Sequence, residues 1–177
     1  MPLTKYEIQN RITESLGSLD DASLPIDVEK IARAQGINII YEDLENDVSG
    51  FLVAKNGCAT IAINKLHNEN RKRFTLDHEL GHFILHLNKD KNEELFIDKV
   101  KFHRNQASAL GLVSQEIEAN RFAAEVLMPE EQLISCVENI SGKSFDIADE
   151  NLIAELAQIF AVSEQALTIR LGDLFLA

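Results

Sequence analysis

Cysteine is scarce in this sequence, and long apolar runs are absent. The two cysteines, Cys58 and Cys136, lie far apart and outside any Cys-x-x-Cys pattern, so a disulfide framework is excluded. Two isolated thiols are typical of a reducing compartment. No charged-then-apolar leader opens the chain, and no apolar run approaches the roughly 20 residues that a membrane helix needs. These absences predict a cytoplasmic protein with no membrane segment.

Basic residues are also few. The 177 residues include 17 Lys and Arg against 29 Asp and Glu, which gives a formal net charge of −12. Because Lys and Arg contacts to phosphate lead nucleic-acid binding, this balance predicts no direct nucleic-acid binding. An acidic chain could suit a basic protein partner, although acidity more often confers solubility. The length is enough for one domain with a single core, or for one domain with a short appendage.

The first 64 residues contain two helical patterns followed by three strand patterns. Apolar residues at helical spacing predict helices over 6–16 and 26–36. Runs rich in β-branched residues predict strands over 37–44, 48–54 and 58–64. The last two strands are joined through Lys55-Asn56-Gly57, and Asn-Gly between apolar runs is a strong hairpin signal.

Beyond Asn64 the apolar pattern becomes helical. Asn68 is placed to cap a helix that continues to Leu85. Further helices are predicted over 114–128, 129–140, 150–160 and 164–175, the last capped by Ser163. The polar stretch 88–111 is predicted to be a connector with a short strand or helix at 95–102. This order predicts an α+β fold, in which a small antiparallel β-sheet with a hairpin packs on a mainly helical body.

The stretch FTLDHELGHFILH, from Phe74 to His86, contains three of the five histidines. In a helix, residues four apart share one face with Cβ atoms about 5–6 Å apart, so His78 and His82 would direct two imidazoles at one point. A zinc ion about 2.0–2.1 Å from each nitrogen requires this arrangement. Glu79 lies one step round the helix, close enough to touch a metal-bound water as a general base. An amphipathic helix that happens to carry histidines is the alternative.

Two features of this helix favour a metal site. The rest of the stretch is largely apolar, so the histidine face would be partly buried, and buried polar groups need partners. Gly81 lies in mid-helix at a cost of about 1 kcal/mol relative to alanine, which indicates a close approach by another backbone or by a substrate. His86 is rotated by about 80° from His78 and does not have the spacing of a metzincin ligand, so we expect it at the helix end or in packing.

The helix predicted over 114–128 offers a third ligand, because Glu116 and Glu118 lie on it about 200° apart and at most one can face the metal. Glu116 shares its face with Asn120, whose amide oxygen would accept the free N–H of a ligand histidine. Glu118 would then be a solvated carboxylate on the helix surface. Helical phase favours Glu116 and leaves Glu118 as the alternative ligand.

A site made of His78, His82 and Glu116 would be a His2Glu centre of the gluzincin type. Zinc suits this set, and manganese is the alternative because availability can override affinity. Zinc-bound water, activated by Glu79, would attack a peptide carbonyl polarised by the metal. The oxyanion of the transition state normally needs a second donor besides the metal. The possible donors or substrate contacts are His103, Arg104 and Tyr41.

The segments FTLDHELGHFILH and EIEANRFAAEVLMP together resemble the ImmA/IrrE family of metallopeptidases, which are bacterial and phage-borne proteins with a zincin-like fold. The pair is far more specific than His-Glu-x-x-His alone, and the resemblance covers residues 25–129. It implies that His78 and His82 are ligands, that Glu79 is the catalytic base and that Glu116 is the third ligand.

Members of this family cleave, or are thought to cleave, helix-turn-helix transcriptional repressors. The resemblance implies such a repressor as substrate, whose cleavage would derepress mobile-element, toxin–antitoxin or stress genes. A non-cleaving anti-repressor that only binds the repressor is the alternative. By analogy with zincins, the substrate backbone would pair with the strand over 58–64 at a sheet edge. We further predict a zincin-like metallopeptidase domain over 1–140 and a C-terminal helical extension over 141–177 packed on it.

The last two predicted helices superficially resemble a helix-turn-helix, which would suggest a DNA-binding regulator. The second of them carries one Arg and no Lys, against Glu164 and Asp173. A helix that reads DNA needs donors for base edges and phosphates. Core helices beneath the catalytic domain are therefore favoured, and a docking surface for the repressor is a further possibility.

Overall fold

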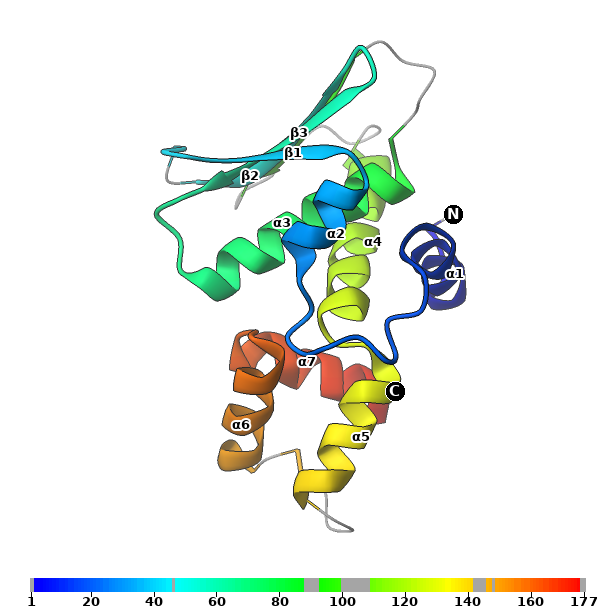
Figure 1. Cartoon of the computed structure of the whole chain (residues 1–177), viewed down its shortest axis with the longest axis vertical. Coiled ribbons are helices and arrows are strands. Elements are labelled where there is room, and N and C mark those ends of the chain that lie inside the picture. The colour runs from blue at the N-terminus through cyan, green and yellow to red at the C-terminus, as the bar shows by residue number, and fades with distance from the viewer. Residues whose placement is uncertain are drawn as a thin grey trace.

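A computed structural model describes residues 2–45, 47–87, 93–99, 109–141, 146–147 and 149–175. The elements are, in chain order, α1 (Lys5–Leu16), α2 (Val28–Ala34), β1 (Ile37–Glu42), β2 (Val48–Lys55), β3 (Cys58–Asn64), α3 (Glu69–Leu85), β4 (Glu93–Lys99), α4 (Ala109–Leu127), α5 (Glu130–Ser141), α6 (Glu150–Phe160) and α7 (Glu164–Phe175). The sheet lies at one end of the molecule and α5, α6 and α7 lie at the other, with α3 and α4 between them (Figure 1). The predicted α+β class is confirmed.

The sheet has four strands in the order β1-β3-β2-β4. β2 and β3 form the predicted hairpin, whose turn residues Asn56 and Gly57 have φ angles of 52° and 78°. A two-residue turn of this kind needs positive φ at both positions, which Asn and Gly adopt most easily. The prediction of a purely antiparallel sheet is wrong, because β1 runs parallel to β3. β1 runs in the same direction as β3, and the pair is parallel because β1 lies next to β3 and not next to β2.

The place of β3 in the sheet also corrects the expected substrate position. Ile61 of β3 is paired with Ile39 of β1 on one side and with Leu52 of β2 on the other. Both backbone edges of β3 are therefore occupied, and a substrate cannot pair there. The outer strands are β1 and β4, and β4 lies in the connector, where a short strand or helix was expected.

Helix α3 packs against the sheet over β2 and β3. Asn68 caps its N-terminus as predicted, with its side chain accepting a hydrogen bond from the Arg71 backbone N–H at 2.9 Å. Gly50 of β2 allows the approach, since a Cβ there would lie 2.5 Å from Thr75 Cγ2 and 2.8 Å from the Ala62 carbonyl oxygen. The close contact fixes α3 relative to the sheet.

One hydrophobic core joins the sheet to the helices. Its fully buried side chains come from both ends of the chain and include Ile8, Leu52, Ile61, Leu80, Phe122, Phe160 and Leu171. Ser163 caps α7 as predicted, accepting from the Ala166 N–H at 3.2 Å. Within the described residues no single helix is long and apolar enough to cross a membrane, and only α6 and α7 taken together across a 103° bend meet that test.

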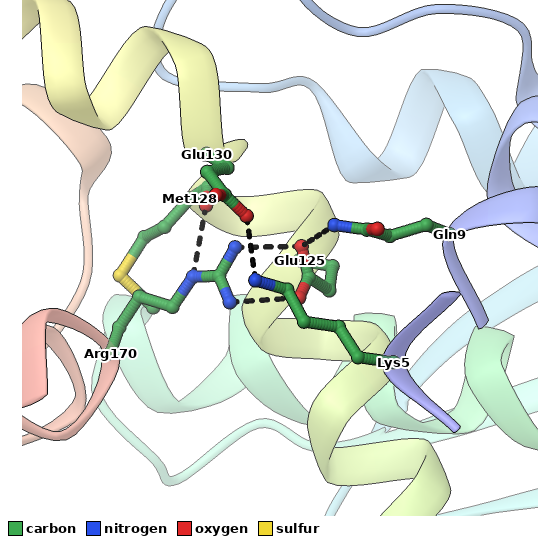
Figure 2. A network of polar contacts seen from close by, with 6 residues as sticks. All are labelled: Lys5, Gln9, Glu125, Met128, Glu130 and Arg170. Atoms are coloured by element: carbon green, nitrogen blue, oxygen red, sulfur yellow. Dashed lines mark hydrogen bonds and ion pairs between the residues drawn. The ribbon is translucent and has the colours of Figure 1, made fainter. Parts of the chain in front are cut away.

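A polar network fastens α7 to α4 and α4 to α1 (Figure 2). The Arg170 guanidinium donates to both carboxylate oxygens of Glu125, at 2.8 and 2.6 Å, and to the Met128 carbonyl oxygen at 3.3 Å. Gln9 of α1 also donates to Glu125, at 3.3 Å. Arg170 and Glu125 are 4% and 5% exposed, so the network lies inside the molecule and holds its C-terminal helix in place.

Candidate metal centre

Helix α3 presents two histidines on one buried face. His78 and His82 are four residues apart, and their Nε2 atoms lie 3.1 Å from each other. Their rings meet edge to face, with centroids 4.7 Å apart. The predicted convergence of these two imidazoles is therefore present, and it follows from the helical period of α3.

Glu116 of α4 completes the group. Its Oε2 lies 3.3 Å from His78 Nε2, and its Oε1 lies 3.2 Å from His82 Nε2. One ligand atom from each of the three residues lies within 4.8 Å of the other two. For a tetrahedral zinc ion about 2.05 Å from each ligand, two ligand atoms lie about 3.3 Å apart. The spacing of the donor atoms thus fits a metal ion of this type.

The electrostatics of Glu116 suit a cation. Burial by itself would raise the pKa of the Glu116 carboxyl. Hydrogen bonds from His78 and His82, together with the charges of the two rings, outweigh the burial and lower that pKa to about 2. The group therefore offers a carboxylate beside two imidazoles near neutral pH, a donor set that divalent transition metals bind.

Asn120 lies one turn after Glu116, on the same helix. Its Oδ1 is 3.0 Å from His78 Nδ1, the ring nitrogen that points away from Glu116. An amide oxygen can only accept, so His78 carries a hydrogen on Nδ1, and loss of the Nε2 hydrogen that it donates to Glu116 would free a lone pair there for a metal. The contact of the Asn120 amide oxygen with a histidine N–H thus has the geometry that was predicted.

Glu79 follows His78 on α3 and is 0% exposed. A carboxylate at this place in a metal-binding helix is suited to take a proton from a water held beside the two histidines. Gly81, two residues on, explains how α4 comes near enough. A Cβ at Gly81 would lie 3.1 Å from Phe122 Cδ1 and 3.2 Å from Ala119 Cα, so the glycine marks a close backbone approach.

Glu118 is not a solvated carboxylate, and that prediction is wrong. It is 7% exposed and accepts hydrogen bonds from the Leu3 backbone N–H at 2.7 Å and from Ser114 Oγ at 3.2 Å. His86 lies at the C-terminal cap of α3, and its Nε2 is 3.5 Å from Glu118 Oε2. The pKa of His86 is lowered, mainly by burial and to a smaller extent by the charge of His82 nearby. Helical phase could not indicate this burial, because the covering segment comes from the other end of the chain.

The sequence did not predict an aromatic contact to His82 from the connector strand. Phe96 of β4 stacks on the His82 ring, with centroids 4.9 Å apart and planes 20° apart. The only sequence signal was the apolar pair at the start of LFIDKVKF, where a strand or helix was possible. This stacking places the edge strand β4 directly beside His82 of the candidate group.

Tyr41 is not brought to this group. It lies on β1, at the opposite edge of the sheet from β4, about 14 Å away for three strand spacings. Its hydroxyl donates instead to the Glu29 carboxylate of α2. The other two possible donors, His103 and Arg104, lie outside the described residues.

Comparison with known proteins relates the chain to a peptidase family, to a phage protein and to a solved structure. Residues 32–172 match a peptidase family described as the IrrE N-terminal-like domain. The uncharacterized immunity region protein 2 of Bacillus phage phi105 is 32% identical over 141 residues, which cover 76% of this chain and 79% of that protein. A solved structure of a Mycobacterium tuberculosis transcriptional regulator superposes on 95% of this chain with a TM-score of 0.56 and 17% identity. This last likeness concerns the fold alone, and the chain spans 46% of that structure's length.

Proposed function

The chain belongs to the ImmA/IrrE family of peptidases, and from this premise we propose that it is a zinc-dependent endopeptidase of the gluzincin type. The observation that carries the proposal is the spacing of His78, His82 and Glu116 around one point. We assign the catalytic unit to residues 1–140 and a helical extension to 141–177.

The metal-holding residues would be His78 and His82 through Nε2 and Glu116 through its carboxylate. When bound there, zinc, or manganese in its place, would lower the pKa of a bound water toward about 7 and polarise the scissile carbonyl. Asn120 holds the His78 ring in the orientation that directs Nε2 inward. Glu79 takes the proton of the attacking water and delivers it to the leaving amine.

We place the extended substrate along β4, because β3 is occupied on both sides. β4 is an outer strand, and Phe96 sets it against His82. A peptide that pairs with an outer strand gains backbone hydrogen bonds whatever its side chains are. The backbone would thereby be held beside the catalytic group.

The proposed substrate is a helix-turn-helix transcriptional repressor, whose cleavage would derepress mobile-element, toxin–antitoxin or stress genes. The relative in Bacillus phage phi105 is named for an immunity region, which supports a role in controlling a mobile element. The second candidate is an anti-repressor that binds the same protein without cutting it. The buried Glu79 beside the histidines favours the enzyme, because binding alone does not need a general base.

The first test is metal content by elemental mass spectrometry on purified wild type, Glu116→Gln and Glu118→Gln. We expect about one zinc per wild-type chain, because three protein ligands make a catalytic zinc site. Glu116→Gln should lose the metal, whereas Glu118→Gln should keep it. Full retention in Glu116→Gln would show that the third ligand lies elsewhere.

The second test is cleavage of the helix-turn-helix repressor encoded nearest to the gene, followed by mass spectrometry of the fragments. Glu79→Gln should keep the metal and cut at least about 100-fold more slowly, the usual contribution of a general base. Undiminished cleavage by this variant would remove Glu79 from the mechanism. Stable binding of the repressor by metal-loaded wild type with no fragments would favour the anti-repressor.

A further inference from the structure

A groove of about 760 Å³ runs beside the candidate metal centre, between α3, α4 and α7. It is lined by residues of the N-terminal half of α3, the C-terminal half of α4 and the first half of α7. A single amino-acid side chain would not fill it. The groove therefore has room for a short peptide segment.

The groove adjoins the candidate metal centre through two of its lining residues. Asn120, whose side chain contacts His78, is one of them. Phe74 also lines it, and the Phe74 ring centroid lies 6.3 Å from that of His78. A peptide whose scissile bond lies at the histidines would therefore enter the groove with its neighbouring residues.

The lining combines apolar side chains with one cation. Apolar walls are formed by Ala124 of α4, by Met128 just after that helix, and by Ile169 of α7, which remains 60% exposed. An isoleucine that the core leaves uncovered on this wall is available to an apolar ligand. Arg71 is the charged residue of the groove, and none of its described lining residues carries a carboxylate. This is notable in a chain with 29 acidic residues, because an acidic peptide would be repelled from most of its surface.

We propose that this groove is the specificity site of the peptidase and takes a substrate segment with an apolar residue next to the scissile bond and an acidic residue farther along. The inference rests on the proposed function, since it assumes that a peptide bond is cut at His78. Arg71 precedes His78 by seven residues of α3, a rise of roughly 10 Å. An extended peptide covers that distance in about three residues. The acidic side chain therefore lies about three positions from the scissile bond and pairs with Arg71.

Arg71 is held in position for this role. One of its five N–H donors binds Ser49 Oγ of β2 at 2.9 Å, which fixes the guanidinium without using its remaining donors. A guanidinium in such a fixed orientation matches a carboxylate better than an ammonium does. The apolar walls set the identity of the residue beside the bond, and Arg71 sets the charge of the residue beyond it.

The test is selection from a randomised synthetic decapeptide library on immobilised, zinc-loaded Glu79→Gln protein, with bound peptides sequenced by mass spectrometry. We expect enrichment of peptides that carry an apolar residue and, about three positions away, Asp or Glu. Adding Arg71→Glu should lower the enrichment of acidic residues by roughly tenfold and favour Lys or Arg, because like charges then oppose each other. Arg71→Lys should keep the acidic preference, and Ile169→Asp should remove the apolar one.

The matched controls are Arg11→Glu on α1 and Thr168→Asp on α7. Both positions are exposed, and neither residue lines the groove. Arg11→Glu changes the charge as Arg71→Glu does, and Thr168→Asp changes it as Ile169→Asp does. Selection that is unchanged in Arg71→Glu and Ile169→Asp, or an absence of selected peptides, would overturn the proposal. The active protein is then given the same library. If the active protein cleaves the library and neither groove variant changes the cleavage profile, the groove is rejected and the peptidase is kept. If the expected peptides are selected but none is cleaved, the peptidase is rejected and the groove remains only as a peptide-binding site.

Discussion

The Tyr41 hydroxyl donates to the Glu29 carboxylate. Burial is the largest cause that raises the pKa of the Tyr41 phenol, and this hydrogen bond is the second. A tyrosine in the unfolded chain ionises near pH 10, so above about pH 10 the folded state holds this proton more firmly than the unfolded state. The free energy of unfolding is then unaffected below that pH and falls as the pH rises through it. In urea denaturation between pH 7 and 11, we expect Tyr41→Phe to show a shallower alkaline loss than wild type.

Tyr6→Phe is the control, because Tyr6 is 71% exposed on α1. It should follow the wild-type profile. An alkaline slope in Tyr41→Phe that equals that of wild type would show that the proton on Tyr41 does not contribute to the pH dependence of folding.

Single residues were predictable where their partners are close in sequence. His78 and His82 meet because a helix places residues four apart on one face, and the phase of α4 indicated Glu116 and Asn120 together. Glu118 was misjudged because its cover, Leu3, lies 115 residues away. Local periodicity contains no information about a partner at that distance.

At the scale of elements, the packing of α3 on α4 depends on Gly81. An alanine there would press on Phe122 and Ala119, which costs about 1–3 kcal/mol against a gain of about 1 kcal/mol in helix propensity. We expect Gly81→Ala to lose roughly 1 kcal/mol of stability in chemical denaturation. Zinc binding measured by competition with a chelator should also weaken, because His82 and Glu116 lie on the two helices that are pushed apart.

Gly172→Ala provides the opposite case on α7. A Cβ at Gly172 would meet nothing within 4 Å, so the alanine should raise stability by up to about 1 kcal/mol without affecting zinc. Equal effects of the two substitutions would contradict the role given to Gly81.

The elements themselves were predictable to different degrees. The hairpin of β2 and β3 could be predicted because Asn56 and Gly57 encode its turn locally. The place of β1 beside β3 and the addition of β4 could not, since strand order is decided by packing between segments distant in sequence. Tyr41, one of the possible oxyanion donors, lies on a strand at the far edge, which its sequence neighbourhood did not indicate.

At the scale of the whole molecule, the buried pair of Arg170 and Glu125 joins the C-terminal helix to α4 (Figure 2). Removing one partner leaves an uncompensated buried charge, so we expect Arg170→Met to cost about 3–5 kcal/mol in the free energy of unfolding. The double variant Arg170→Met with Glu125→Leu should recover much of this loss, because no buried charge remains. Chemical denaturation of the single and double variants measures both effects.

Lys5→Met removes the other ion pair of the network, between Lys5 and Glu130, whose side chains are partly exposed. Its loss should stay within about 1 kcal/mol, as is usual for pairs that water screens. A loss as large as that of Arg170→Met would mean that position in the network, and not burial, determines the energy.

The fold class followed from the order of sequence periods, since three strand patterns follow one another directly and most helical patterns come after them. The division at 140 and 141 remains a prediction. Two hydrogen bonds from α3 to the segment after α6 could not be predicted. Arg73 donates to the Ala161 carbonyl oxygen at 3.3 Å, and Asn70 donates to the Val162 carbonyl oxygen at 2.9 Å. No local sequence pattern indicates a side chain that binds a distant backbone.

The attachment of α1 has a consequence for the order of events during synthesis. Leu3, Gln9 and Lys5 bind partners that lie 115, 116 and 125 residues farther along the chain. At roughly 5–20 residues per second, those partners leave the ribosome about 6–25 s after the α1 residues that they bind. Until then the apolar face of α1, with Ile8 and Ile12, has no α4 to cover it. Helix α1 is therefore among the last of these elements to dock, and in a chain stalled before residue 118 it would be a target for chaperones.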